Sequence, residues 1–266
     1  MPTARQGPLP PYTRSTAHEA GWQWCIPLQH RTGNGHVFAS GYTSEQQALE
    51  RLMQNLDAPV LADPRLIRFR AGRRRKAWDK NCVAIGLASG FLEPLESTSI
   101  HAVQDAIFQL LINFPDRSRN PLFAAEYNRG IQDFYERARD FIILHYKLNE
   151  RSDAPMWRYT AAMAVPDSVQ ERIEHYRASG RVHVQDKVEL FSKASWLAVL
   201  NGQLLQPERI DPLAQMYDAA RFKPLLGGLR RLVDEAARAQ MSHEAYLERH
   251  CMDPTLNGSS LSGGAP

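Results

Sequence analysis

The chain has 266 residues, 43% of them hydrophobic and 23% charged, and its 32 Lys and Arg nearly balance its 29 Asp and Glu. This length supports one large domain or two smaller ones, each with a hydrophobic core. The net charge of +3 is too small to indicate nucleic-acid binding by itself. No apolar run approaches the ~18 residues of a membrane span, and the N-terminus lacks the apolar core of a signal peptide.

The cysteines favour a reducing compartment and argue against a zinc site. Cys25, Cys82 and Cys251 are odd in number and far apart, with no CxxC and no Cys/His ligand spacing. We therefore expect a cytoplasmic protein with no membrane segment and no bound metal.

Strand patterns lie in the first 90 residues. Apolar and polar residues alternate over 22–29, and a second short strand is expected at 36–39. Between them, Thr32-Gly33-Asn34-Gly35 is typical of a hairpin turn that needs positive φ angles. Further strands are expected at 66–70 and at 82–85, the latter apolar on both faces and therefore central in a sheet.

Helix patterns dominate the rest of the chain. Ser44 and Gln47 form a capping-box pattern at the start of a helix that runs to Leu56. A helix is expected over 99–114. Its apolar face consists of Val103, Ile107, Leu110, Leu111 and Phe114. Asn120-Pro121 predicts the start of a long helix ending near Leu148. Later helices are expected over 167–180, from 211 and over 225–250 with a break at Ser242, before a disordered tail at 259–266. The predicted fold class is α+β.

The stretch 81–104 is the strongest candidate for chemistry. It reads as a strand, a glycine-bearing loop and a helix start at which Ser97, Thr98 and Ser99 can cap. The free backbone N–H groups of such a helix start attract an anion, and two carboxylates, Glu93 and Glu96, precede it. An ordinary strand–turn–helix with solvated glutamates explains the same pattern. No dinucleotide or P-loop fingerprint is present.

The run from Gly86 to Thr98, GLASGFLEPLEST, closely resembles the segment of flavin-dependent tryptophan halogenases that carries their catalytic glutamate. Trp22-Gln23-Trp24-Cys25-Ile26-Pro27 matches the W-x-W-x-I-P motif of the same family. The stretch Asp140–Tyr146 is similar as well. These matches occur in order and extend from about Pro11 to Gly202.

The resemblance implies roles for individual residues. Glu96 would be the carboxylate beside the reacting substrate carbon, and Thr98 and Ser99 would contact the halide. Leu87 and Ile100 would touch the flavin.

The W-x-W-x-I-P motif has its own implied role. Trp22, Trp24, Ile26 and Pro27 would keep the substrate apart from the flavin and suppress monooxygenation. The implied reaction uses reduced FAD from a separate flavin reductase, oxygen and chloride or bromide to halogenate tryptophan or a related indole.

The resemblance also implies a domain organisation. Residues 1–118 would be the C-terminal remainder of a flavin-monooxygenase-like, FAD-binding domain, and 119–258 a mainly helical domain covering the substrate. The family's glycine-rich flavin motif and its catalytic lysine are absent from the sequence, so the chain looks N-terminally truncated and is expected to be inactive alone.

Three alternatives accompany this interpretation. Trp196 either lines an aromatic substrate pocket or is an ordinary core tryptophan of an amphipathic helix. The basic run Arg73–Lys76 with Trp78 either binds nucleic acid or, as we expect, is a solvated turn. The whole chain is either part of a halogenase or a catalytically inactive fragment or helical binding module.

Overall fold

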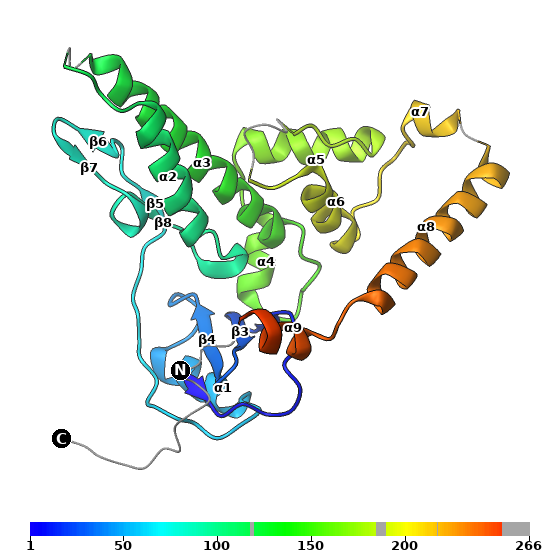
Figure 1. The fold of residues 1–266 in the computed structure, drawn as a ribbon, viewed down its shortest axis with the longest axis horizontal. Coiled ribbons are helices and arrows are strands. Elements are labelled where there is room, and N and C mark those ends of the chain that lie inside the picture. The colour runs from blue at the N-terminus through cyan, green and yellow to red at the C-terminus, as the bar shows by residue number, and fades with distance from the viewer. Residues whose placement is uncertain (118–119, 185–189, 217, 252–266) are drawn as a thin grey trace. The chain divides into compact units, whose positions relative to one another are not determined.

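The computed structural model describes residues 1–117, 120–184, 190–216 and 218–251 (Figure 1). It divides into two compact units, one formed by Met1–Leu66 with Leu213–Pro266 and the other by Ile67–Pro212. Strands concentrate in the first 91 residues and helices dominate afterwards, so the α+β prediction is confirmed.

The first unit is built on a four-stranded antiparallel sheet of order β1-β4-β3-β2 (Figure 1). Its strands are β1 (Pro2–Thr3), β2 (Arg14–His18), β3 (Gly21–Pro27) and β4 (Thr32–Phe38). Strands β3 and β4 form a hairpin in which Pro27 faces Thr32 and Gly21 faces Phe38.

The turn of this hairpin lies four residues earlier than the sequence predicts. Residues 28–31 make the connection, where the Leu28 amide donates to the Arg31 carbonyl at 2.8 Å. Gly33 and Gly35 are strand residues opposite Ile26 and Trp24, and neither has positive φ. They are glycines because the Trp24 indole lies over both of them. The turn prediction at 32–35 was therefore wrong.

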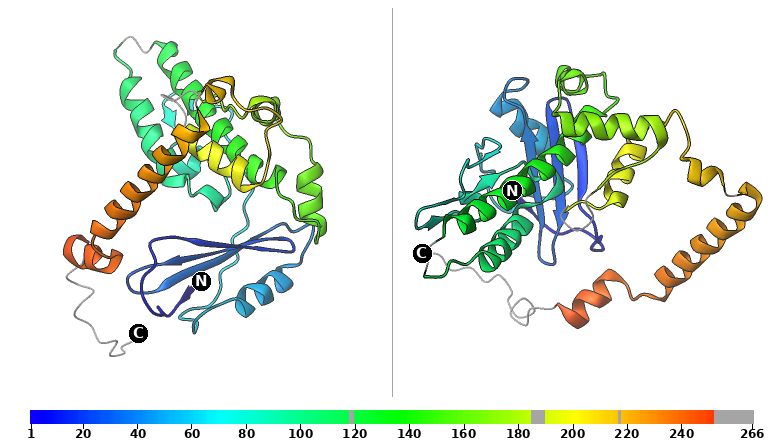
Figure 2. Two further views of the ribbon diagram at one scale, coloured as in Figure 1. Left: turned by 90° about the vertical axis from the view of Figure 1, so that its right-hand side faces the viewer. Right: turned by 90° about the horizontal axis from the view of Figure 1, so that it is seen from above.

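Helix α1 (Glu45–Gln54) lies along one side of the sheet (Figure 2). The predicted capping box at its start is confirmed, since Ser44 and Gln47 exchange side-chain-to-backbone hydrogen bonds. The helix buries Ala48 and Leu52, and the Ala48 carbonyl lies 3.0 Å from Nδ1 of His36 on β4.

Two C-terminal helices also belong to the first unit, α8 (Ala219–Ala239) and α9 (His243–His250). Ser242 caps α9, which confirms the predicted break. Helix α9 is tied to the N-terminal segment by the ion pair of Glu244 with Arg5 and by the contact of His243 with the Leu9 carbonyl. The apolar stripe of α8 is exposed and consists of Phe222, Leu225, Leu226, Leu229, Leu232 and Val233. The short helix α7 (Pro212–Gln215) precedes them.

The strands of the second unit are only two residues long. Strand β5 (Gly72–Arg73) pairs with β8 (Gly90–Phe91), and β6 (Trp78–Asp79) pairs with β7 (Cys82–Val83). The expected strand at 66–70 is absent, and the expected central strand at 82–85 is a short hairpin arm with Cys82 exposed. An apolar run of four residues cannot distinguish a sheet core from a hairpin packed on a helix, and here the hairpin packs on α3.

Helices α2 (Ser99–Ile112) and α3 (Pro121–Lys147) pack together in the second unit (Figure 1). Asn120 caps α3 as predicted, its side chain accepting from the Leu122 amide. The first half of α3 shares a core with α2 and the β6 segment. That cluster is Ala77, Trp78, Ala102, Ala106, Tyr127, Ile131 and Tyr135.

The second half of α3 belongs to another core. It packs with α5 (Asp167–Ser179) and α6 (Lys193–Gly202), while α4 (Pro155–Ala162) also contacts α3. The predicted end of α5 is confirmed by Gly180, a left-handed C-cap with φ of 67°. Buried members of this cluster are Phe141, Leu144, Val169, Ile173, Tyr176, Val182, Trp196 and Leu200.

The buried face of α2 differs from the predicted one. Ala102 and Ala106 face the core, because small side chains let α2 approach α3 closely. Most of the large apolar side chains consequently point outward, and we call them the α2 apolar face. Its exposed members are Ile100, Ile107, Phe108, Leu111, Ile112 and Phe114.

The compact units do not follow the expected boundary at 118/119, because α2 and α3 on its two sides pack against each other. The assignment of 1–118 and 119–258 to two domains of a larger enzyme remains a prediction. The tail at 259–266 lies outside the described residues. No described helix is long and apolar enough to span a membrane.

Candidate functional site at the start of helix α2

The loop before α2 is built from two 3-10 turns, Gly86–Ala88 and Pro94–Glu96. Ser97 follows in the left-handed region, with φ of 51°. Thr98 is the N-cap of α2, yet its side chain makes no capping hydrogen bond. The expectation that a hydroxyl caps this helix was wrong. The backbone N–H groups of the first turn therefore stay available, since they have no acceptor within the helix.

A small pocket opens beside this helix start. It has a volume of about 10 Å³, the scale of one bound water. Its lining brings together Leu87, Thr98 and Ser99 of the predicted site with Tyr135 of α3. The Tyr135 hydroxyl donates to the Gly90 carbonyl at 2.9 Å and so fixes the loop against α3. Burial raises the pKa of this phenol, which keeps it protonated as a donor.

Both glutamates of the loop are engaged by the end of α3. Oε1 of Glu96 lies 2.9 Å from Nε2 of His145. The hydroxyl of Tyr146 reaches both carboxylate oxygens of Glu93 at 2.8 Å. The loop carboxylates are therefore held in defined positions, unlike the solvated glutamates of the ordinary alternative.

The two predicted flavin contacts lie in the loop and in the first turn of α2. Leu87 and Ile100 are 72% and 75% exposed. A planar aromatic ring with polar edges needs exposed aliphatic side chains together with free N–H groups. The side chains present fit the edge of a flavin in their chemical type.

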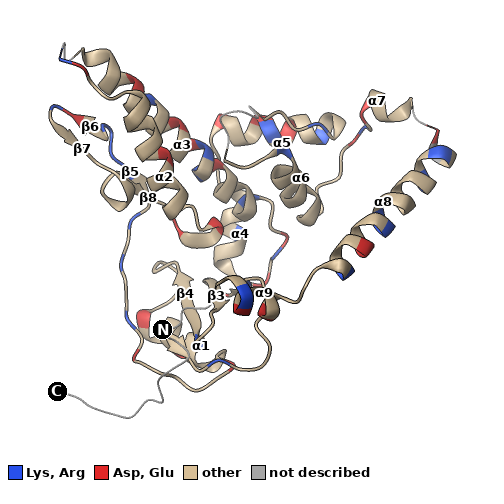
Figure 3. Cartoon of the chain, viewed as in Figure 1, with Lys and Arg blue, Asp and Glu red and all other residues tan. Residues whose placement is uncertain are grey.

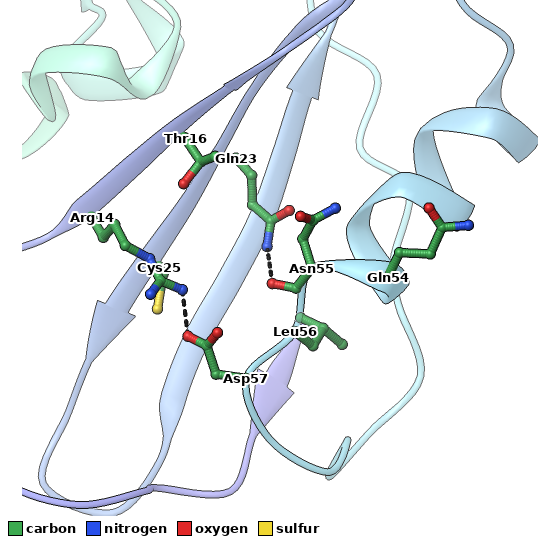
Figure 4. A pocket seen from close by; sticks show the side chains of 8 residues that line it. All are labelled: Arg14, Thr16, Gln23, Cys25, Gln54, Asn55, Leu56 and Asp57. Carbon is green, nitrogen blue, oxygen red and sulfur yellow. Dashed lines mark hydrogen bonds and ion pairs between the residues drawn. The ribbon is translucent and has the colours of Figure 1, made fainter.

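The W-x-W-x-I-P motif lies on β3 in the first unit. Trp22 is buried, while Trp24, Ile26 and Pro27 are partly buried. Successive strand residues point to opposite faces, so Gln23 and Cys25 lie on the other side from the tryptophans. They line a polar pocket of about 370 Å³ together with residues of β2 and the segment after α1 (Figure 4).

The polar groups of this pocket pair with one another. Arg14 forms an ion pair with Asp57, and the Gln23 amide donates to the Asn55 carbonyl at 3.2 Å (Figure 4). Burial raises the pKa of the Cys25 thiol, which disfavours the reactive thiolate. These contacts engage Arg14, Asp57 and the Gln23 amide within the pocket.

Trp196 is fully buried in the core beside Phe141. Their rings meet edge to face at 4.8 Å, and the Arg172 guanidinium lies 4.2 Å from the indole centroid. This is the core alternative of the sequence analysis, and the indole has no exposed surface that could meet a substrate.

The basic run is largely engaged locally. Arg73 pairs with Glu136 at 2.8 Å, Arg74 donates to the Ala88 carbonyl at 2.5 Å, and Lys76 lies 3.7 Å from Asp79. Charges of both signs are interspersed along α3, α5 and α8 (Figure 3). Within the described ranges, no three His, Cys, Asp or Glu side chains gather as metal ligands.

The sequence alone indicates no role for His145 and Tyr146, although both lie in the stretch Asp140–Tyr146 that is similar to the family. A helical signal was available, because Phe141 and His145 are four residues apart on the partly buried side of α3. Nothing in the sequence indicated that the glutamate loop packs on that side.

The comparisons with known proteins identify the family of the chain. The tryptophan halogenase family model matches residues 1–219. Among solved structures, BrvH, a flavin-dependent halogenase from Brevundimonas sp. BAL3, is 45% identical with a TM-score of 0.88, covering 93% of this chain and 50% of its own. Xcc4156, a flavin-dependent halogenase from Xanthomonas campestris, is 43% identical with a TM-score of 0.90, covering 95% and 51%.

A curated relative gives the same result. The tryptophan 6-halogenase SttH from Streptomyces toxytricini is 40% identical over 238 residues, which are 85% of this chain and 45% of that protein. The chain spans about half the length of the relatives it matches. With most of its length matched in sequence and structure, the chain belongs to the family of flavin-dependent tryptophan halogenases.

Proposed function

We propose that the chain is the substrate- and halide-facing part of a flavin-dependent halogenase that acts on tryptophan or a related indole. The observation that carries the proposal is the arrangement at the start of α2. A fixed carboxylate, Glu96, lies in the same loop and helix start as a small pocket lined by Leu87, Thr98 and Ser99.

The anion site is assigned to Thr98 and Ser99. Free N–H groups and the positive end of the helix favour a small anion there. Chloride or bromide would bind at this point, with Leu87 and Ile100 against the flavin ring. Reduced FAD would be delivered by a flavin reductase. When bound, it would supply, together with oxygen, the chemistry that oxidises halide to hypohalous acid.

Glu96 has the role of a fixed anion beside the substrate. When the aromatic ring forms its bond to the halogen, positive charge develops on the ring, and a preorganised carboxylate stabilises it. Trp22, Trp24, Ile26 and Pro27 keep the substrate apart from the flavin. We place the reaction in the cytoplasm.

Activity requires a partner polypeptide or segment equivalent to the half of the relatives that this chain does not span. The 266-residue chain by itself is therefore expected to retain no FAD and to halogenate nothing. The large exposed side chains of the α2 apolar face support this requirement.

Complementation tests the proposal. The chain is combined with the half of the Brevundimonas halogenase that it does not align with, together with FAD, a flavin reductase, bromide and either tryptophan or indole. Mass spectrometry should find a brominated product with both halves and none with either half alone. Two folded, associated halves that give no product would contradict the proposal and favour an inactive fragment.

A further inference from the structure

His145 occupies a defined place between α3 and the glutamate loop. Its Nδ1 lies 2.8 Å from the Phe141 carbonyl oxygen, one turn earlier in α3. Its Nε2 lies 2.9 Å from Oε1 of Glu96. Both ring nitrogens thus have an oxygen partner, and the side chains of His145 and Glu96 are only 21% and 28% exposed.

The Phe141 contact fixes the orientation of the imidazole ring. A carbonyl oxygen only accepts, so Nδ1 must carry a hydrogen to bond with Phe141. Nε2, on the other side of the ring, lies against Oε1 of Glu96 at 2.9 Å, so the ring that α3 holds in place is the one that contacts the carboxylate.

The neighbouring ionisable groups are occupied elsewhere. Glu93 of the same loop accepts from Tyr146, and the Lys147 ammonium donates to the carbonyls of Ala161 and Met163. Phe141 packs edge-on against the imidazole, with ring centroids 5.0 Å apart. Among the described residues, no other side chain contacts the carboxylate of Glu96 as an ion pair or hydrogen-bond partner.

We infer that His145 is the positioning residue of Glu96, holding Oε1 through its Nε2 contact and leaving Oε2 for the substrate. The inference rests on the proposed function for its chemical meaning. After halogen addition, the ring C–H bond breaks, its electron pair returns to the ring, and the proton goes to Oε2 of Glu96. Oε1 stays in contact with His145 throughout, so the carboxylate keeps its orientation while its charge changes.

The pairing is measured first, on the 266-residue chain labelled with ¹⁵N-histidine. The wild-type chain should give an Nδ1–H signal for His145 protected by its bond to Phe141, and an Nε2 resonance whose chemical shift reports the neighbouring carboxylate. Glu96→Gln should shift the Nε2 resonance and preserve the Nδ1–H signal. Glu93→Gln, which changes the neighbouring carboxylate, should preserve both, and His145→Gln assigns them by their loss.

A spectrum of His145 that is the same in the wild type and in Glu96→Gln would overturn the inference, and so would a ring lacking the Nδ1 proton. These results do not depend on halogenation. A confirmed pair in a complemented enzyme that makes no product would instead count against the proposed function.

The second measurement uses the complemented enzyme. His145→Leu should lower kcat roughly 100-fold, the scale of a misplaced reacting group, with the KM for halide unchanged. His145→Gln keeps a donor for Oε1 and should recover much of that loss. Equal kcat in the wild type and His145→Leu would overturn the positioning role.

Discussion

The indole of Trp24 lies directly over Gly35 on the neighbouring strand. A Cβ atom added at Gly35 would overlap the indole ring, and one at Gly33 would also be crowded by it. Gly33 and Gly35, opposite the W-x-W-x-I-P motif, therefore leave room for the Trp24 indole, which packs flat against the sheet.

Gly35→Ala should destabilise the first unit because neither the indole nor the strand can move without loss of packing. Overpacking of this kind costs about 1–3 kcal/mol, which urea unfolding monitored by tryptophan fluorescence can measure. Gly41→Ala is the matched control, since nothing lies within 4 Å of a Cβ there. Trp24→Leu combined with Gly35→Ala should recover part of the loss, and strictly additive effects would contradict the contact.

The parts of the fold that were predictable depend on local chemistry. Ser44 with Gln47 and Asn120 with Pro121 specify helix starts by hydrogen bonds that involve only neighbouring residues. The misassigned turn at 32–35 depended on a tryptophan in another strand, which local sequence does not reveal.

The same distinction applies to the site. The strand–loop–helix pattern predicted Thr98 and Ser99 at a helix start with Glu96 in the loop before it, and that is where they lie. His145 contacts Glu96 through tertiary packing of α3 on the loop, and no spacing rule connects two residues so far apart in sequence. The exposed face of α2 was also unpredictable, because small alanines rather than large side chains form the contact with α3.

Glu96→Gln should abolish most halogenation while the fold remains intact. In the complemented enzyme, we expect a loss of roughly two orders of magnitude or more in turnover, the effect of removing one preorganised charge. Flavin binding should be unchanged. Glu93→Gln is the control and should reduce turnover much less, because that carboxylate is turned toward Tyr146. Equal losses in the two variants would refute the assignment of Glu96.

Thr98→Val tests the halide site at the start of α2. The substitution removes a nearly buried hydroxyl that makes no capping bond, so the helix should persist. The bromide concentration for half-maximal rate should rise about tenfold, the typical loss for one hydrogen bond to a charged group. Ser97→Ala is the control, since Ser97 is exposed and its hydroxyl donates to the Pro94 carbonyl. A change in maximal rate alone would place the halide elsewhere.

Proline at position 99 would be a poorer test of the same site. It would remove one N–H donor, but Thr98 has helical backbone angles, with ψ of −8°. A residue before proline is disfavoured in that conformation. Loss of halide affinity could then arise from a displaced helix start.

Asp105 on α2 should make the stability of the second unit depend on pH. Burial raises the pKa of this carboxyl above 3.8, only partly offset by its hydrogen bond to Gln109. The folded state then binds the proton more tightly than the unfolded state. Its contribution to the free energy of unfolding is therefore largest below pH 3.8 and falls as pH rises through the folded pKa. Asp105→Asn should remove that fall and gain stability relative to the wild type between acidic and neutral pH. Urea midpoints across this pH range that stay parallel in the two proteins would contradict it.

Charged substitutions on the α2 apolar face should separate the behaviour of the isolated chain from that of the complemented enzyme. Phe108 and Leu111 are 59% and 66% exposed, so Phe108→Lys and Leu111→Lys should change the stability of the isolated chain by less than about 0.5 kcal/mol. Both should make it more soluble, because an exposed apolar patch promotes association.

In the complemented enzyme the same two variants should lose binding of the second half and, with it, product formation. The reason is that a lysine ammonium would be buried without a partner if this face is covered, which is strongly unfavourable. Leu122→Lys on α3 is the matched control, because Leu122 is equally exposed but lies off this face. It should improve solubility and leave complementation intact. Unimpaired association and activity in Phe108→Lys and Leu111→Lys would mean that the complementing half covers a different surface.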